Sequence, residues 1–548
     1  MVKGILVFAT VIITVVAISR MYFRLPSFTT AASRSTHDES PAQTPDDNGK
    51  SAAEVRMRRQ PHILFVVADD LGWNDIGFRN DAVLTPNLDA LAREGVILNQ
   101  SYVQPICSPT RSCFMTGRYP IHTGVKGIIM PQQGFGLNPT LNTIANALRE
   151  LGYATHMVGK WHLGFCKQAY IPTQRGFDTF YGHYLGAEDY YTHRRTASVP
   201  AAGRQGVRKV RGYDFHRDTR DSFHSEYAAD GVYSTEAFGK EVVDIIDRHD
   251  PSTPLFLYLA FQAIHGPLQV PRRYLDMYKN FKGSSDRRHV LGMLAAMDEA
   301  IGNVTQALRQ NNLWDNTLVV FTTDNGGEVT QGGNNWPLRG NKGTVWEGGT
   351  RGTAFIHASW LTTKGSTYNG IIHAVDWYPT LIAAAGGDSG GSGNIKDGMG
   401  IDGLDMWPAL QDNRTSPRTG FVYNIDPDSN TFAIRVGRYK YIKSNAGLRD
   451  NWYPAAADGD SQRWLLFALR QSESSVKTLA AGPWLFNVDN DPLEKNNLHD
   501  SMPEQVQLME RELAGYMESY TAPPRCAHTL DPGCDPGLRD GTWSPGWC

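Results

Sequence analysis

Four apolar segments of strand length, each ending abruptly in polar residues, constrain the fold of this chain most strongly. Apolar runs without alternation suit strands that are buried on both faces of a largely parallel sheet. Ligands of such sheets bind beyond the carboxyl ends of the strands, where the polar residues would lie. A single polar ending commonly means only that the strand ends in solvent. Four strands with the same ending favour a ligand-binding site. The segments and the residues that follow them are 62–68 with Asp69 and Asp70, 154–159 with Lys160 and His162, 255–264 with His265, and 318–323 with Asp324 and Asn325.

Amphipathic segments lie between these predicted strands. The alternation of strand and helix predicts an α/β domain in which helices flank a large, mostly parallel sheet. Beyond Pro417, four short strands with alternating faces and a helix from about Pro503 to Tyr520 predict a smaller C-terminal α+β domain with an antiparallel sheet. We place the larger domain at residues 61–416 and the smaller at 417–548. The helices expected in the larger domain cover residues 85–95, 140–152 and 293–308.

The composition is that of a globular protein, with 53 basic and 56 acidic side chains among 548 residues and 41% hydrophobic residues. Because there is no basic surplus, we expect no nucleic-acid partner. Residues 1–24 contain an apolar run flanked by basic residues, which predicts a signal peptide or an uncleaved signal anchor. Residues 25–60 are polar and predict a disordered linker. Membrane contact is expected only if residues 1–24 stay attached.

Entry into the secretory pathway would turn three sequons, at Asn99, Asn303 and Asn413, into potential glycosylation sites. Three of the six cysteines lie in the first third of the chain and three at the extreme C-terminus. This distribution would allow long-range disulfides that tie the tail to the larger domain, although the connectivity cannot be read from the sequence.

The strand endings place oxygen-bearing side chains together. Asp69, Asp70, Asp324 and Asn325 come from two distant strands. Three carboxylates so close would raise one another's pKa unless a cation neutralised them. Oxygen ligands select a hard ion, Ca²⁺ or Mg²⁺, over zinc.

Cys107 stands at the predicted start of a helix, in the segment Cys107-Ser-Pro-Thr-Arg111. A helix N-terminus favours an anion, and Arg111 lies one turn further on the same face. By this chemistry Cys107 is either an activated thiolate, as in a cysteine hydrolase or phosphatase, or a half-buried structural cysteine.

The same segment resembles the signature of type I sulfatases, and residues 152–164 resemble their second signature. The Asp69-Asp70 and Asp324-Asn325-Gly-Gly segments match the metal-site motifs of that family. Further segments are most similar to the arylsulfatase B branch of animal sulfatases. The resemblance runs from about residue 60 to the end and implies an alkaline-phosphatase-like sandwich fold. The segments that carry the arylsulfatase B resemblance are 175–178, 186–191, 332–340 and 534–547.

The resemblance implies that a formylglycine-generating enzyme oxidises Cys107 to formylglycine during maturation. One hydroxyl of the hydrated aldehyde would attack the sulfur of a sulfate ester, and the other would release sulfate. It also implies one Ca²⁺ ion that is held by residue 107 together with Asp69, Asp70, Asp324 and Asn325.

The remaining charged residues receive roles from the same resemblance. Lys160 and Lys342 would hold the sulfate oxygens, and Arg111 would support the formylglycine. His162 would form a hydrogen bond with the hydroxyl of the formylglycine. His265 would contact the substrate and protonate the leaving alcohol.

The arylsulfatase B resemblance implies the 4-sulfate of N-acetylgalactosamine in dermatan or chondroitin sulfate as substrate. It also favours a lysosomal location, while secretion or type II membrane anchoring stays open. Alternatives are a sulfatase of another sulfated glycan or of aryl sulfates, and a catalytically silent glycan-binding relative. A phosphoryl-transfer hydrolase of the same superfamily is a further alternative, against which Cys107 and the oxygen-rich metal set count.

Overall fold

The computed structural model assigns the chain to two units, Met1–Met57 and Arg58–Cys548, and the described residues belong to the second. The predicted signal segment and the linker up to residue 59 lie outside the described residues. No helix in the described part is both long and apolar enough to cross a membrane. The described residues are 60–200, 206–388, 400–453, 482–524 and 530–548.

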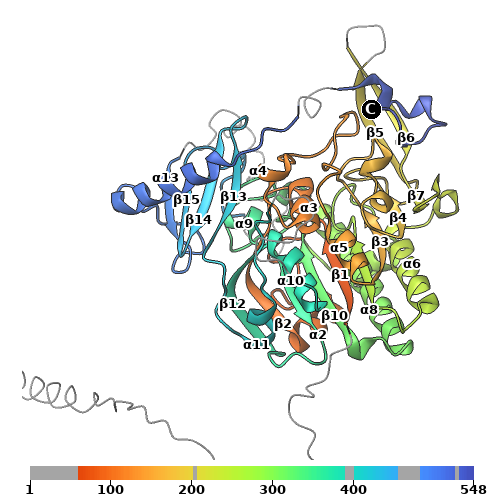
Figure 1. Cartoon of the computed structure of the whole chain (residues 1–548), viewed down its shortest axis with the longest axis horizontal. Coiled ribbons are helices and arrows are strands. Elements are labelled where there is room, and N and C mark those ends of the chain that lie inside the picture. The colour runs from red at the N-terminus through yellow and green to blue at the C-terminus, as the bar shows by residue number, and fades with distance from the viewer. Residues whose placement is uncertain (1–59, 201–205, 389–399, 454–481, 525–529) are drawn as a thin grey trace, which may run out of the picture. The chain divides into compact units, whose positions relative to one another are not determined.

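A ten-stranded sheet organises the described chain (Figure 1). Its five central strands, β10, β1, β9, β3 and β4, are parallel, and antiparallel pairs flank them. In sheet order the strands are β12 (Ser366–His373), β2 (Val96–Tyr102), β11 (Ala354–His357), β10 (Thr317–Thr323), β1 (His62–Ala68), β9 (Leu255–Ala260), β3 (Ala154–Lys160), β4 (Thr179–His183), β7 (His216–Thr219) and β8 (Phe223–Ser225).

Both faces of the central strands are buried, as the continuous apolar runs predict. Along β1, Phe65 and Val67 belong to one hydrophobic core, whereas Leu64 and Val66 belong to the core on the opposite face. All four predicted segments form strands of this sheet. The third ends at Ala260, earlier than the sequence predicts.

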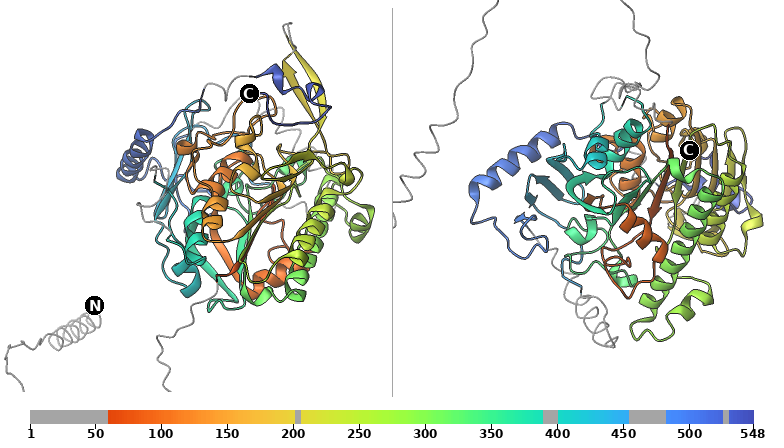
Figure 2. Two further views of the ribbon diagram at one scale, coloured as in Figure 1. Left: turned by 45° about the vertical axis from the view of Figure 1, so that its right-hand side comes forward. Right: turned by 90° about the horizontal axis from the view of Figure 1, so that it is seen from below.

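Helices cover both faces of the sheet (Figure 2). The predicted helix 140–152 begins only at Ile144, because Thr143 caps it by accepting a hydrogen bond from the Asn146 backbone N–H. The predicted helix 293–308 begins eight residues earlier, where Ser284 caps it. The helices of one face include α2 (Pro86–Glu94), α6 (Ser234–Arg248), α7 (Arg272–Met277) and α8 (Ser285–Gln310). Those of the other include α3 (Cys107–Thr116), α4 (Pro120–Thr123), α5 (Ile144–Glu150), α10 (Trp377–Ala384) and α11 (Trp407–Asp412).

A separate four-stranded antiparallel sheet follows, as predicted. The buried Met509 and Leu513 of α13 join the core that this sheet shares with one face of the large sheet. The fold class predicted from the sequence is confirmed, while the boundary at residue 416 stays a prediction. The elements are β13 (Gly420–Asp426), β14 (Thr431–Val436), β15 (Tyr439–Ile442), β16 (Trp484–Asn487) and α13 (Pro503–Glu518), and the short helix α9 (Glu347–Thr350) lies earlier in the chain.

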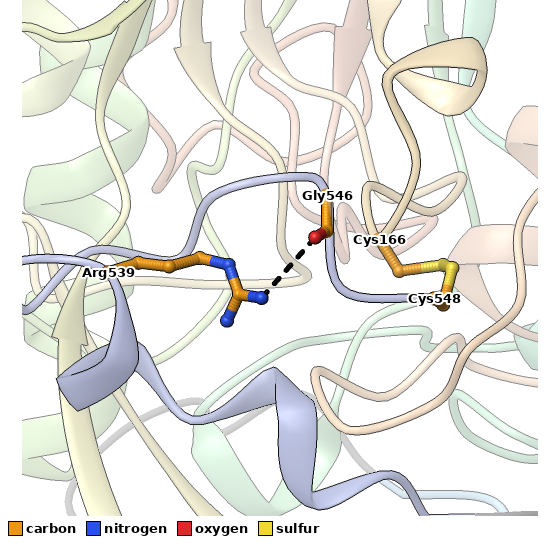
Figure 3. Close-up of a disulfide and its surroundings, with 4 residues drawn as sticks. All are labelled: Cys166, Arg539, Gly546 and Cys548. Carbon is orange, nitrogen blue, oxygen red and sulfur yellow. Dashed lines mark hydrogen bonds between the residues drawn. A yellow bond between two sulfur atoms is a disulfide. The ribbon is translucent and has the colours of Figure 1, made fainter.

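The C-terminal tail returns to the larger domain, where Cys548 forms a disulfide with Cys166 (Figure 3). The backbone N–H of Gly546 donates to the carbonyl oxygen of Cys166 at 2.7 Å, and the Gly546 carbonyl accepts from Arg539 at 3.5 Å. This is a long-range link of the kind that the cysteine distribution allows. The tail also borders a two-stranded hairpin, β5 (Arg194–Pro200) and β6 (Val207–Tyr213).

The three sequons differ in exposure. Asn303 on α8 and Asn413 after α11 are exposed. Asn99 in β2 is half-buried, and its side-chain amide donates to Asn369 at 2.8 Å. Glycosylation at all three stays a prediction, and Asn99 is the least accessible of them.

Candidate active site

The predicted site residues meet at the carboxyl edge of the parallel strands. Asp69 follows β1 and Asp324 follows β10, and the register of these two strands pairs their last residues, Ala68 and Thr323. Lys160 is the last residue of β3 in the same sheet. The parallel strands β10, β1 and β3 of this sheet therefore place carboxylates and a cation at the same edge.

Cys107 is the first residue of α3, and its side chain is 1% exposed. Its Sγ donates to Asp69 Oδ1 at 3.5 Å. Burial, reinforced by the charge of Asp324, raises the pKa of the Cys107 thiol above its ordinary value. The thiol is therefore neutral at physiological pH, which argues against a thiolate nucleophile.

Two buried ion pairs involve Asp69, which accepts from Cys107, and Asp324. The Lys160 ammonium donates to Asp69 Oδ2 at 2.5 Å. Arg111 donates from Nε and Nη2 to Asp324 Oδ2 at 3.0 and 2.8 Å, and from Nη1 to the Lys160 carbonyl at 2.9 Å. Burial and the neighbouring Asp324 raise the pKa of Asp69 to about 7. Burial is the larger cause, and the repulsion between carboxylates that the sequence predicts adds to it.

Asp70 makes a second set of buried contacts. Its carboxylate accepts from the Lys342 ammonium at 2.8 Å and from the Asn325 amide at 2.7 Å. Burial alone would raise the pKa of Asp70, but the charge of Lys342 and the hydrogen bonds from Lys342 and Asn325 hold it below its usual value. His265 Nε2 lies 3.9 Å from Asp70 Oδ2.

His265 is neutral in this arrangement. Burial and the charge of Lys342 lower the pKa of His265 to about 3, and its Nδ1 lies 2.6 Å from the carbonyl oxygen of Gly266. If Nδ1 donates to that carbonyl, Nε2 is left as an acceptor. The predicted role as proton donor then requires that Nε2 first takes up a proton.

His162 is held by its backbone. It has a φ of 59°, and its N–H donates to the Tyr184 carbonyl at 3.0 Å. A Cβ on Gly186 would lie 2.6 Å from the imidazole, so the glycine leaves room for the ring. Burial and Lys160 lower the pKa of His162 well below its ordinary value. His162 Nδ1 is buried and has no hydrogen-bond partner among the described residues.

The carboxylate oxygens of Asp69 and Asp70 and the amide oxygen of Asn325 are donors of the kind that a hard cation takes. Ligand atoms of Asp69, Asp70, Cys107 and His265 lie within 4.8 Å of one another. Asn325 Oδ1 is buried, and the described residues offer it no hydrogen-bond partner, although its Nδ2 is bonded. An amide oxygen in this state is costly unless something binds it. Asp324 is not in this group of ligand atoms, and Arg111 donates two hydrogen bonds to its Oδ2.

His183 was not singled out from the sequence, yet it belongs to this edge. It ends β4 and pairs in register with Lys160. Its buried Nε2 likewise lacks a partner within the described ranges. The signal was present, because the apolar segment Phe180-Tyr181 also ends in a histidine, but β4 is only five residues long.

Comparisons of the chain with known proteins identify its family. A model of the sulfatase family matches residues 61–387. Arylsulfatase J of Mus musculus is 40% identical over 507 residues, which cover 89% of this chain and 80% of that protein. N-acetylgalactosamine-6-sulfatase of Canis lupus familiaris is 28% identical over 514 residues, covering 89% and 90%.

A solved structure agrees. The crystal structure of Ps i-CgsB in complex with k-i-k-neocarrahexaose superposes with a TM-score of 0.68 at 30% identity, covering 85% of this chain and 94% of that one. The chain therefore belongs to the sulfatase family, whose members hydrolyse sulfate esters.

Proposed function

We propose that this protein is a calcium-dependent sulfatase whose nucleophile is formylglycine made from Cys107. The observation that carries the proposal is the position of Cys107. It begins α3 among the carboxylates and cations of the sheet edge, yet burial keeps its thiol neutral. The site therefore surrounds a side chain that is a poor nucleophile as encoded, which supports a chemical conversion before use.

Formylglycine, when present and hydrated, would supply hydroxyl oxygens as nucleophile, and calcium would supply positive charge that lowers a hydroxyl pKa. Asp69, Asp70, Asp324 and Asn325 would hold the ion together with residue 107. The unpartnered Asn325 Oδ1 supports this assignment.

The charge balance of the site supports an anionic substrate. With Asp69 ionised, as a bound cation would keep it, Asp69, Asp70 and Asp324 offer three negative charges to the three positive charges of Lys160, Lys342 and Arg111. A divalent cation would leave the site with a surplus of two positive charges. A sulfate monoester anion would reduce that surplus in a place where water cannot.

The protein's own side chains would then divide the work. Lys160 and Lys342 would turn from Asp69 and Asp70 to the sulfate oxygens, and Arg111 would hold Asp324 in place. His162, whose Nδ1 is free of protein partners in the described chain, would bond the nucleophile. His265 would pass a proton to the leaving oxygen.

We propose a sulfated glycan as the substrate class and N-acetylgalactosamine 4-sulfate of dermatan or chondroitin sulfate as the first sugar to test. The named relatives support this class, since one is an N-acetylgalactosamine-6-sulfatase and one structural neighbour was crystallised with neocarrahexaose. Arylsulfatase J leaves aryl sulfates as the alternative.

The test is to express the protein in animal cells, remove N-glycans and record the mass of the tryptic peptide Glu94–Arg111. We expect the aldehyde at residue 107, together with hydrolysis of a nitrophenyl sulfate and of at least one sulfated sugar. Cys113→Ser, which alters a buried free cysteine of the same helix, is the matched control and should be modified normally. An intact Cys107 in wild-type protein that still hydrolyses sulfate esters would overturn the mechanism.

The location is a linked proposal. We propose maturation in the secretory pathway, with the lysosome as destination. The mass of the mature N-terminus in the same sample decides whether residues 1–24 are removed. Retention of this segment would instead support the membrane-anchored form.

A further inference from the structure

The hairpin β5–β6 carries an unusual local charge. Residues 194–213 contain six basic and no acidic side chains, whereas the whole chain has a formal net charge of −3. Such a concentration of one sign on a short hairpin is unfavourable for folding alone, because the charges repel. It therefore calls for an explanation outside the hairpin.

One face of the hairpin is covered by the C-terminal tail. The backbone of Tyr213 accepts from Trp543 and donates to Gly541, both at 2.8 Å. The Trp543 indole donates to the Arg195 carbonyl at 3.1 Å, and Arg208 forms an ion pair with Asp535. The disulfide between Cys166 and Cys548 anchors the end of this tail, so the tail is covalently held near the face that it covers.

The opposite face is open and cationic. Thr196 pairs with Arg211 and Ser198 pairs with Lys209, and all four side chains are exposed. Neither Lys209 nor Arg211 forms an ion pair with any residue in the described part of the chain, although Arg211 donates to the Thr192 hydroxyl at 3.2 Å. Two residues apart on one strand, these cations are about 7 Å from each other along it.

The cationic face starts beside the candidate active site. Arg211 contacts Thr192, whose backbone N–H donates to Asp189 at 2.8 Å. Tyr190, between these two residues, donates its hydroxyl proton to the carbonyl oxygen of His265 at 2.8 Å. The cationic face therefore begins at the segment 189–192, which contacts the backbone of His265. Figure 1 shows the hairpin extending outward from the part of the large sheet that contains β3 and β4.

We infer that the exposed face of β5–β6, with Lys209 and Arg211 as its charged contacts, is an auxiliary binding surface for the anionic polysaccharide chain that bears the scissile sulfate. The inference rests on the proposed function. It deepens that function by naming a polymeric substrate, because a sulfated glycan chain carries many anionic groups and a small aryl sulfate carries one. Complementary charge selects the occupant, since repeated sulfates and carboxylates match repeated exposed cations.

The test uses the full-length secreted protein and dextran sulfate as the polyanion. Binding is measured by elution from immobilised dextran sulfate in a salt gradient, and hydrolysis of a nitrophenyl sulfate is measured on the same samples. We expect Lys209→Gln/Arg211→Gln to bind roughly three- to tenfold more weakly and to elute at lower salt, because two exposed charge contacts are lost. Hydrolysis of the small ester should stay unchanged.

Lys279→Gln/Lys282→Gln is the matched control, since both residues are exposed and lie outside the hairpin. An equal loss in both variants would show a general charge effect and overturn the inference, as would unchanged binding of the hairpin variant. Failure of wild-type protein to hydrolyse any sulfate ester would refute the proposed function instead, and the binding measurement would still decide this inference by itself.

Discussion

Two buried charge clusters in this protein differ in whether their buried polar atoms have partners. This difference distinguishes a ligand site from a structural contact. The cluster at the sheet edge contains Asn325 Oδ1 and His162 Nδ1, which have no partner among the described residues. The second cluster joins α9 to the small sheet. There, Lys440 Nζ lies 3.0 Å from Glu347 and 2.7 Å from Glu494, and tyrosine hydroxyls complete both Glu347 oxygens at 2.9 Å.

The comparison teaches that burial of charge alone does not identify function. In the second cluster Glu494 Oε1 also lacks a well-oriented hydrogen bond among the described residues, but it lies 2.7 Å from Lys440 Nζ. Its charge is therefore matched by a cation, and we expect this cluster to act on stability. The first cluster holds buried polar atoms that lack any partner, charged or neutral, among the described residues, so we expect it to act on a ligand. Four predictions test this distinction between the two clusters.

Cys107→Ala should have the largest effect. It removes the proposed nucleophile, so hydrolysis of a nitrophenyl sulfate should fall by at least about a thousandfold. The thermal midpoint should change by only a few degrees, because the thiol makes a single weak hydrogen bond. Activity close to wild type would place the nucleophile elsewhere.

Lys440→Met should leave Glu347 and Glu494 buried without their cation. Removal of one partner of a buried pair costs about 3–5 kcal/mol, so the free energy of unfolding should drop by that amount in urea titration. The specific activity of the folded fraction should persist. Lys443→Met is the control: this half-exposed lysine pairs with Glu510, and its loss should cost less than about 1 kcal/mol. Equal losses would contradict the distinction between the clusters.

Calcium should stabilise only through the first cluster. At a concentration of one hundred times its Kd, a ligand that binds the folded state adds about 2.7 kcal/mol, which is measurable as a rise in thermal midpoint. Asp70→Asn should abolish the rise, whereas Glu494→Gln should retain it. A rise that persists in Asp70→Asn would locate the ion at another site.

The pH dependence of stability tests Glu494 of the second cluster, when wild type is compared with a variant at that residue. Burial, opposed by Lys440 and reinforced by Glu347, raises the pKa of Glu494 from 4.5 to about 7. The folded state thus binds the proton more tightly, so its contribution is full below pH 4.5 and is lost as the pH rises to about 7.

Over that interval the stability advantage of wild type over Glu494→Gln should fall by on the order of 2 kcal/mol. Glu510→Gln should show no such trend above pH 5, since the pKa of Glu510 is lowered. An unchanged difference between wild type and Glu494→Gln would mean that Glu494 is ionised throughout.

Much of the fold and of the first cluster could be predicted because the signals are local. The strand β1 and the pair Asp69-Asp70 are adjacent in sequence, and Cys107 stands beside its own helix start. The second cluster could not be predicted, because Glu347 and Lys440 are 93 residues apart and neither interrupts an obvious pattern. Helix starts also shifted where a local cap, Thr143 or Ser284, decided the boundary.

The kind of sheet, the edge that carries the polar residues and the family could be inferred from the sequence, because apolar periodicity and short motifs are properties of neighbouring residues. Folding in three dimensions sets which carboxylate pairs with which cation, that Cys548 is bonded to Cys166, and which face of β5–β6 is open. These outcomes depend on strand register and on burial of segments far apart in the chain. Burial then sets the pKa and the pairing of each group, because charges in a low-dielectric interior respond to neighbours that the local sequence does not reveal.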